Sequence, residues 1–137
     1  MTIQMPVYLD ANFFIIYNFD PTARGEAARS ILERIMKGSL RAMTSALALD
    51  EVMWVIMKNM KHELLRETIE DIFAIENLVV KDVFSSTPLD ALDYIEKYDL
   101  KPRDAFHVAL MKSAGLNEIV SDDRDFDRVK GIKRIKL

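Results

Sequence analysis

The fold is decided by a short stretch near the start of the chain, Val7-Tyr8-Leu9-Asp10-Ala11-Asn12. Residues 5–9 are expected to form a short buried strand, and Asp10 or Asn12 can cap the helix that follows it. A carboxylate directly after a buried strand emerges at the carboxyl edge of its sheet. In open α/β sheets that edge is where ligands bind.

The same order of strand and helix recurs along the whole chain. We expect strands over residues 5–9, 40–44, 78–83, 118–121 and 132–136. Two helices fill each gap between the first four strands, and they begin near Asp10 or Asn12, Thr22, Ser45, His62, Ser86 and Pro102. Gly38 and Gly115 are expected to end two of them. Strands joined by helical connections predict an α/β fold with a mostly parallel sheet and helices on its faces.

The composition indicates an ordinary folded protein. The chain has 137 residues, of which 50% are hydrophobic and 30% charged, so one domain over residues 1–137 is expected. It has no cysteine, which excludes disulfides and thiolate metal sites and fits a reducing compartment. Residues 1–6 lack the features of a signal peptide, and the apolar runs are too short to span a bilayer. We therefore expect a cytoplasmic protein that does not enter the membrane.

The net charge of −3 does not favour binding to nucleic acid, but the basic residues are unevenly distributed. Six of them gather near the end of the chain: Arg124, Arg128, Lys130, Lys133, Arg134 and Lys136. Such a segment either contacts phosphates or is a solvated, charged terminus, and the sequence leaves both interpretations open.

Acidic residues recur where the expected strands give way to helices. Beside Asp10 they are Glu51, Asp104 and a turn containing Asp122, Asp123, Asp125 and Asp127. Each has a plain structural alternative: Asp10 can cap a helix, Glu51 can form a closed ion pair, and Asp104 can favour a helix dipole. The turn can be a cluster of caps anchored by Phe126. Glu51 and Asp104 share helix faces with apolar residues, however, and an unpaired carboxylate is costly there.

Taken together, these acids describe a site of oxygen ligands with little histidine. That chemistry favours Mg²⁺ or Mn²⁺ over zinc. A carboxylate-held metal can bind a substrate phosphate and lower the pKa of a water that attacks phosphorus in line. His107 follows Asp104 by one helical turn, so it is either a metal ligand or a histidine in the core behind the ligands.

Four segments resemble the motifs of the PIN domains, and within them the compact nucleases of the VapC toxin type. They are Val7–Asn12, Thr44–Val52, Arg103–Ala109 and Ile119–Phe126. The resemblance covers essentially the whole chain in the family's order. It implies a three-layer α/β/α sandwich and a metal-dependent endoribonuclease that hydrolyses RNA phosphodiester bonds.

The resemblance also implies roles for individual residues. The expected catalytic acids are Asp10, Glu51, Asp104 and Asp123. The expected ligands of Mg²⁺ or Mn²⁺ are Asp10, Asp104, Asp123 and Asp125. Asn12 and Ser121 would support these acids, whereas Asp50, Asp122 and Asp127 would lie at the surface or cap helices. The implied partners are RNA, a cognate antitoxin protein and a second copy of the chain.

Three other functions stay open at this point. The chain could be a non-catalytic module that binds RNA or protein, or a nuclease of RNA maturation outside any toxin–antitoxin pair. A phosphatase for small molecules is weaker, because the residue two positions after Asp10 is Asn12 rather than a second aspartate. Finally, Met53, Met57 and Met60 recur beside Trp54 at helical spacing, which indicates either core packing or an adaptable partner surface.

Overall fold

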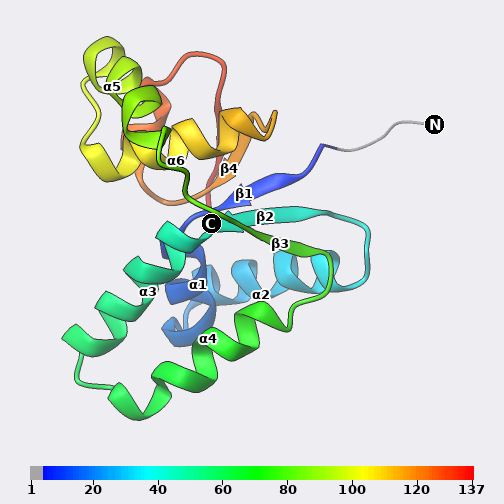
Figure 1. Ribbon diagram of the computed structural model, residues 1–137. Helices are drawn as coiled ribbons and strands as arrows, with labels where there is room; N and C mark the ends of the chain where they lie inside the picture. Colours follow the sequence, from blue (N-terminus) through cyan, green and yellow to red (C-terminus); the bar gives the residue numbers. More distant parts are fainter. Residues whose placement is uncertain (1–4) are drawn as a thin grey trace.

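In the part of the chain that the structure describes, five short parallel strands form the centre of the molecule (Figure 1). They are β1 (Val7–Leu9), β2 (Ala42–Ser45), β3 (Leu78–Lys81), β4 (Glu118–Val120) and β5 (Lys133–Ile135). Their order across the sheet is β3-β2-β1-β4-β5, and every neighbouring pair is parallel. This computed structural model describes residues 5–137, so part of the segment examined for a signal peptide lies outside it.

Within residues 5–137, six α-helices and two short 3₁₀ helices connect the strands. The helices are α1 (Ala11–Phe19), α2 (Ala23–Met36), α3 (Ala46–Lys58), α4 (Leu65–Phe73), α5 (Thr87–Tyr98) and α6 (Pro102–Ser113), with η1 (His62–Leu64) and η2 (Arg124–Arg128). Two α-helices lie between each successive pair of the first four strands. The expected order of elements is therefore confirmed.

Alternating side chains of β1 divide the helices between the two faces of the sheet. Val7 and Leu9 pack with α1 to α4, whereas Tyr8 packs with α5, α6 and η2. Figure 1 shows these helix groups on opposite sides of the strands. The first core contains the fully buried Phe13 and Phe14, each of which contributes roughly 1.5–3 kcal/mol of hydrophobic stabilisation. The three-layer α/β/α sandwich is thus confirmed.

Local signals explain where the helices begin and end. The Asp10 carboxylate accepts a hydrogen bond from the Phe13 N–H at 3.2 Å, and Ser45 Oγ accepts one from the Ala48 N–H at 3.3 Å. Gly38 adopts φ +81° just beyond α2, in the left-handed region that glycine tolerates. Thr22 occupies the cap position of α2, but its side chain bonds to Asp20 instead of the helix.

Several boundaries and faces differ from expectation. The helix expected over residues 62–75 is divided into η1 and α4, and it follows Met60, whose φ of +58° turns the chain sharply. The third strand ends at Lys81 rather than at residue 83. Met53 and Met57 are exposed because α3 buries its other face, and Met60, beyond the end of α3, is exposed as well. The buried residues of α3 are Ala48, Leu49, Val52 and Ile56. Of the two interpretations of these methionines left open by the sequence, core packing is therefore wrong.

The basic end of the chain is an ordered edge of the sheet. Arg134 lies in β5 and donates to the Ser121 carbonyl and to both carboxylate oxygens of Asp127. Lys130, Lys133 and Lys136 are exposed, which is compatible with both interpretations of this segment, contact with phosphates and a solvated terminus. Within residues 5–137, no helix combines the length and apolarity that crossing a membrane requires.

Candidate functional site

A cleft of about 450 Å³ opens where the central strands end. All four predicted catalytic acids line it: Asp10, Glu51, Asp104 and Asp123. They come from the end of β1, from α3, from α6 and from the turn after β4, so the parallel sheet brings together residues far apart in the sequence. The same cleft is also lined by Trp54, Lys58 and Arg103.

Asp10 lies deepest among these acids. The residue is 5% exposed, and its carboxylate caps α1. Burial raises the pKa of Asp10 to about 6, and the nearby Glu51 adds to the rise. A hydrogen bond with Ser121, the proximity of His107 and the Phe13 N–H all act in the opposite direction without cancelling the effect of burial.

Three further carboxylates form a cluster between α6 and the turn after β4. One oxygen from each of Asp104, Asp123 and Asp125 lies within 4.8 Å of the others. Burial raises the pKa of Asp104 to about 6, and the negative charges of Asp123, Asp125 and Glu51 raise it further, against the lowering effect of His107. Crowded carboxylates repel one another, and a divalent cation relieves that repulsion.

The cations of the protein do little to neutralise these acids. Among residues 5–137, no lysine or arginine nitrogen lies within 4.0 Å of a carboxylate oxygen of Asp10, Asp104 or Asp123. Asp125 does contact Arg128, at 3.4 Å. The donor set of clustered, largely unpaired carboxylate oxygens therefore suits a hard divalent cation.

Glu51 lies at the partly buried end of a chain of hydrogen bonds that runs into the core. Its Oε1 lies 2.8 Å from His107 Nε2, and His107 Nδ1 lies 2.7 Å from the Tyr8 hydroxyl. That hydroxyl is in turn 2.7 Å from Ser45 Oγ. Both ring nitrogens of His107 are therefore engaged, which leaves neither for a metal and supports a role behind the ligands. Burial is the largest cause of the raised pKa of the Tyr8 phenol.

The turn after β4 is fixed by its own side chains. The Asp123 N–H donates to Ser121 Oγ at 3.0 Å, and the Asp125 N–H donates to Asp123 Oδ1 at 2.9 Å. Phe126 is 1% exposed and, as predicted, anchors the turn, here in the core that Tyr8 forms with α5 and α6. Ser121 itself is fully buried, and it contacts the backbone of one acid and the carboxyl group of another.

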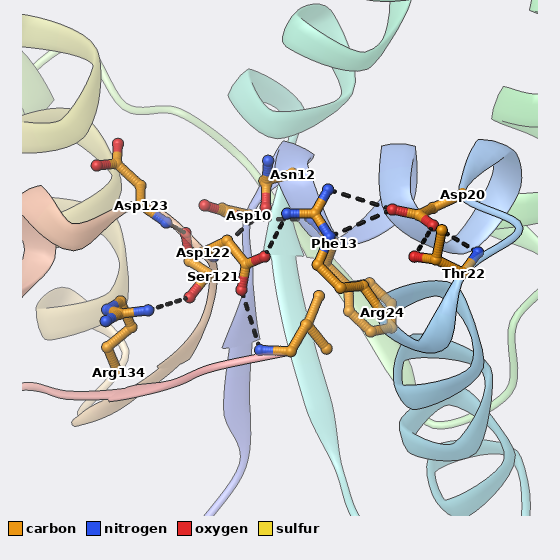
Figure 2. A network of polar contacts seen from close by, with 11 residues as sticks. Asp10, Asn12, Phe13, Asp20, Thr22, Arg24, Ser121, Asp122, Asp123 and Arg134 are labelled. Atoms are coloured by element: carbon orange, nitrogen blue, oxygen red, sulfur yellow. Dashed lines mark hydrogen bonds and ion pairs between the residues drawn. The ribbon is translucent and has the colours of Figure 1, made fainter.

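The side chain of Asp122 has different partners from that of its neighbour Asp123 (Figure 2). Its carboxylate accepts from Arg24 at 2.8 Å and from the Leu137 N–H at 3.0 Å. Its own N–H donates to Asn12 Oδ1 at 3.3 Å. The prediction of a surface or capping role for Asp122 was wrong, because it joins α2 and the C-terminus to the turn. Asn12 supports this junction, and Asp10 alone caps α1.

Comparison with known proteins identifies the family. A family model described as the PIN domain matches residues 7–132. The chain belongs to the PIN-domain family. It is also 33% identical over 114 residues to ribonuclease VapC13 of Mycobacterium tuberculosis, a match that covers 79% of this chain and 82% of that relative. The resemblance to VapC ribonucleases is therefore confirmed.

Solved structures share the fold of this PIN domain. VapBC2 from Rickettsia felis, bound to a DNA fragment from its promoter, superposes with a TM-score of 0.77 at 13% identity and covers 97% of this chain and 99% of its own. A toxin–antitoxin complex from Klebsiella pneumoniae gives a TM-score of 0.65 at 19% identity, covering 92% and 94%. At such low identity these similarities establish the three-layer fold.

The PIN domain brings the predicted acids together and adds residues that the sequence did not single out. Asp125 lies with Asp104 and Asp123, whereas Asp50 and Asp127 are exposed as expected. Tyr8 bonds to His107 and Ser45 bonds to the Tyr8 hydroxyl, but they were expected only as a strand residue and a cap. A tyrosine within an otherwise aliphatic buried strand was the available signal, since a buried hydroxyl requires a hydrogen-bond partner.

Proposed function

We propose that this PIN domain is an endoribonuclease that hydrolyses RNA phosphodiester bonds with Mg²⁺ or Mn²⁺. The observation that carries the proposal is the meeting of Asp10, Glu51, Asp104 and Asp123 in one cleft, where burial and crowding raise the pKa of two of them to about 6. The VapC ribonucleases among its relatives support the same reaction and substrate class.

Each acid has a proposed task that its position supports. Asp104, Asp123 and Asp125 would hold the divalent cation, with Asp10 facing it from the end of β1. When bound, such a cation neutralises phosphate charge and lowers the pKa of water. Glu51 has Oε1 occupied by His107, so its Oε2 is left to accept a proton from the attacking water. Ser121 orients Asp10 and the turn that carries Asp123.

The proposed biological setting is a toxin–antitoxin pair. A chain of a solved toxin–antitoxin complex shares this fold. We propose a cognate antitoxin and a homodimer for the present chain too. We further propose that residues 1–137 act as one domain and meet their RNA in the cytoplasm. Copurification of a small partner protein encoded beside this one would separate a toxin from a nuclease of RNA maturation.

The direct test is RNA cleavage by the purified protein with and without Mg²⁺ or Mn²⁺. We expect cleavage that requires the metal and is abolished by Asp10→Asn, a substitution that keeps a good helix cap. The matched control is Asp127→Asn, an exposed acid of the same turn as Asp123. Equal cleavage by wild type and Asp10→Asn would refute the proposal. If no Mn²⁺ binds in calorimetry, the non-catalytic module is favoured instead.

A further inference from the structure

One face of α3 is directed into the acidic cleft. Glu51, Trp54, Val55 and Lys58 follow the spacing i, i+3, i+4 and i+7, and all four line the cleft. Glu51 belongs to the proposed reaction, whereas Trp54 and Lys58 have no part in it. The helix therefore presents an aromatic ring and a cation within two turns of a catalytic acid.

Trp54 is the single tryptophan of the chain, and it is 51% exposed. A lone exposed apolar residue is common and by itself indicates nothing. Here, however, the indole borders a cleft of carboxylates, while α3 packs into the core through its opposite face. An exposed ring at such a place offers a flat π surface to whatever enters the cleft.

Two cations share the cleft and are only weakly engaged by the protein's own acids. Lys58 Nζ lies 5.5 Å from the centre of the Trp54 ring and forms no ion pair within residues 5–137. Arg103 is 56% exposed and approaches Glu51 only to 3.9 Å. Both side chains are long and exposed enough to turn toward a phosphate, whose charge the neighbouring carboxylates would otherwise repel.

We infer that this part of the cleft is a subsite for an unpaired nucleotide of RNA: Trp54 stacks on the base, and Lys58 and Arg103 bind the adjoining phosphates. The inference rests on the proposed function and specifies the form of its substrate. A base must leave its helix to stack on an indole, so the enzyme would act on single-stranded segments and loops. Stacking on a ring tolerates any base, and sequence preference would have to come from other contacts.

A second copy of the chain is the competing occupant of Trp54. A neighbouring hollow is lined by Met53 and Met57 together with Trp54 and Lys58, and a protein partner there would also cover the indole. The acids and Arg103 line the other hollow, on the side of the proposed reaction. The combination of carboxylates, cations and a flat ring in one cleft fits RNA better than an apolar protein surface.

Because Trp54 is the single tryptophan, its fluorescence reports on this subsite alone. The full chain carrying Asp10→Asn, which prevents cleavage, is titrated with a single-stranded RNA oligonucleotide, with the same strand in a duplex and with an abasic strand of equal length. Binding is followed in parallel by the anisotropy of a labelled strand. We expect quenching by the single strand, and little quenching by the duplex or by bound abasic strand.

Variants separate stacking from general binding. Trp54→Ala should weaken RNA affinity roughly 10- to 100-fold, within the range of base–aromatic stacking, whereas Trp54→Phe should stay within a few-fold of wild type. Met57→Ala, an exposed neighbour on α3 outside the acidic cleft, is the matched control and should bind normally. Mn²⁺ affinity should be the same in all three. In the cleavage-competent chain, Trp54→Ala should raise KM more than it lowers kcat.

Failure of the subsite can be distinguished from failure of the ribonuclease. RNA that binds by anisotropy without quenching Trp54, or that binds Trp54→Ala as tightly as wild type, overturns the subsite while leaving the ribonuclease intact if wild type still cleaves. If Trp54 fluorescence is quenched as the protein concentration rises without RNA, and RNA adds no quenching, Trp54 serves self-association. That result also overturns the subsite. A chain that neither cleaves nor binds RNA fails the proposed function itself.

Discussion

Two groups of carboxylates lie close together in this protein and differ in the cations around them. The cleft acids are Asp10, Asp104 and Asp123; the paired acids are Asp20, Asp122 and Asp127. Figure 2 shows Arg24 between two of the paired acids, Asp20 and Asp122. Arg134 pairs with the third. Within residues 5–137, no lysine or arginine nitrogen lies within 4.0 Å of a carboxylate oxygen of Asp10 or Asp123. Hydrogen bonds from Thr22 lower the pKa of Asp20, and those from Arg134 lower the pKa of Asp127. Burial, in contrast, raises the pKa of Asp10 and Asp104.

The contrast shows which acids serve the fold and which await a ligand. Arginines are present in the same region, yet the fold places them on Asp20, Asp122 and Asp127. The cleft acids remain crowded and partly desolvated, an arrangement that destabilises the protein unless a cation is added. Unrelieved charge at a sheet edge is thus the strongest physical mark of function in this chain.

The largest effect is expected from removing one charge of the metal cluster. Asp104→Asn should lower Mn²⁺ affinity and RNA cleavage by at least about 10- to 100-fold, the loss seen when even an indirect partner of a metal ligand is removed. Isothermal calorimetry and a cleavage assay measure the two quantities. Asp127→Asn, a paired acid, should leave both unchanged. Equal losses in the two variants would erase the distinction between the groups.

The next effect concerns stability in metal-free buffer. Because burial raises the pKa of Asp10 to about 6, its ionisation destabilises the native state as pH rises from 4 to above 6. Asp10→Asn should therefore be more stable than wild type at pH 7, by about 3 kcal/mol at most, and equally stable near pH 3. Denaturant unfolding across this pH range measures the difference.

A paired acid should show the opposite sign. The pKa of Asp127 is lowered by Arg134, so its contribution to stability is present at neutral pH and is lost as pH falls below about 4. Asp127→Asn should therefore be slightly less stable than wild type at pH 7. If both substitutions shift stability in the same direction at pH 7, the electrostatic contrast between the groups is wrong.

Glu51 belongs to neither group, because the partner nearest to its carboxylate is a histidine, His107, at 2.8 Å. Tyr8→Phe removes the hydroxyl that bonds to His107 and Ser45, and it should cost about 1–3 kcal/mol, because a buried ring nitrogen loses its partner. Cleavage should fall as well, since His107 orients Glu51. Tyr94→Phe, at a partly exposed tyrosine of α5, is the control for both measurements.

The smallest effect is expected from removing the arginine that two of the paired acids share. Arg24→Ala removes the cation shared by Asp20 and Asp122, but the arginine side chain is 53% exposed, and exposed pairs contribute roughly 0.2–1 kcal/mol. Thermal unfolding should detect a shift of that size, with cleavage unchanged. A large loss of cleavage would mean that the paired acids take part in the reaction.

The sequence predicts what depends on neighbouring residues. The strand expected over residues 5–9, the cap at Asp10 or Asn12 and the alternation of strands and helices follow from local patterns, and they place the four acids at one sheet edge. Local patterns could not distinguish Asp122 from Asp123, because that depends on Arg24, which lies 98 residues away. The bond between Tyr8 and His107 likewise spans 99 residues. For the methionines of α3, helical spacing defined a face but not which face would be buried.

The central claim is that the cleft acids, and not the paired acids, hold a divalent cation. A crystal soaked in Mn²⁺ and measured near the manganese absorption edge tests it directly. We predict an anomalous peak bounded by Asp104 and Asp123, with Asp10 and Asp125 beside it, and no peak near Asp20, Asp122 or Asp127. Manganese at the paired acids, or a cleft without an anomalous peak at saturating metal, would contradict the account.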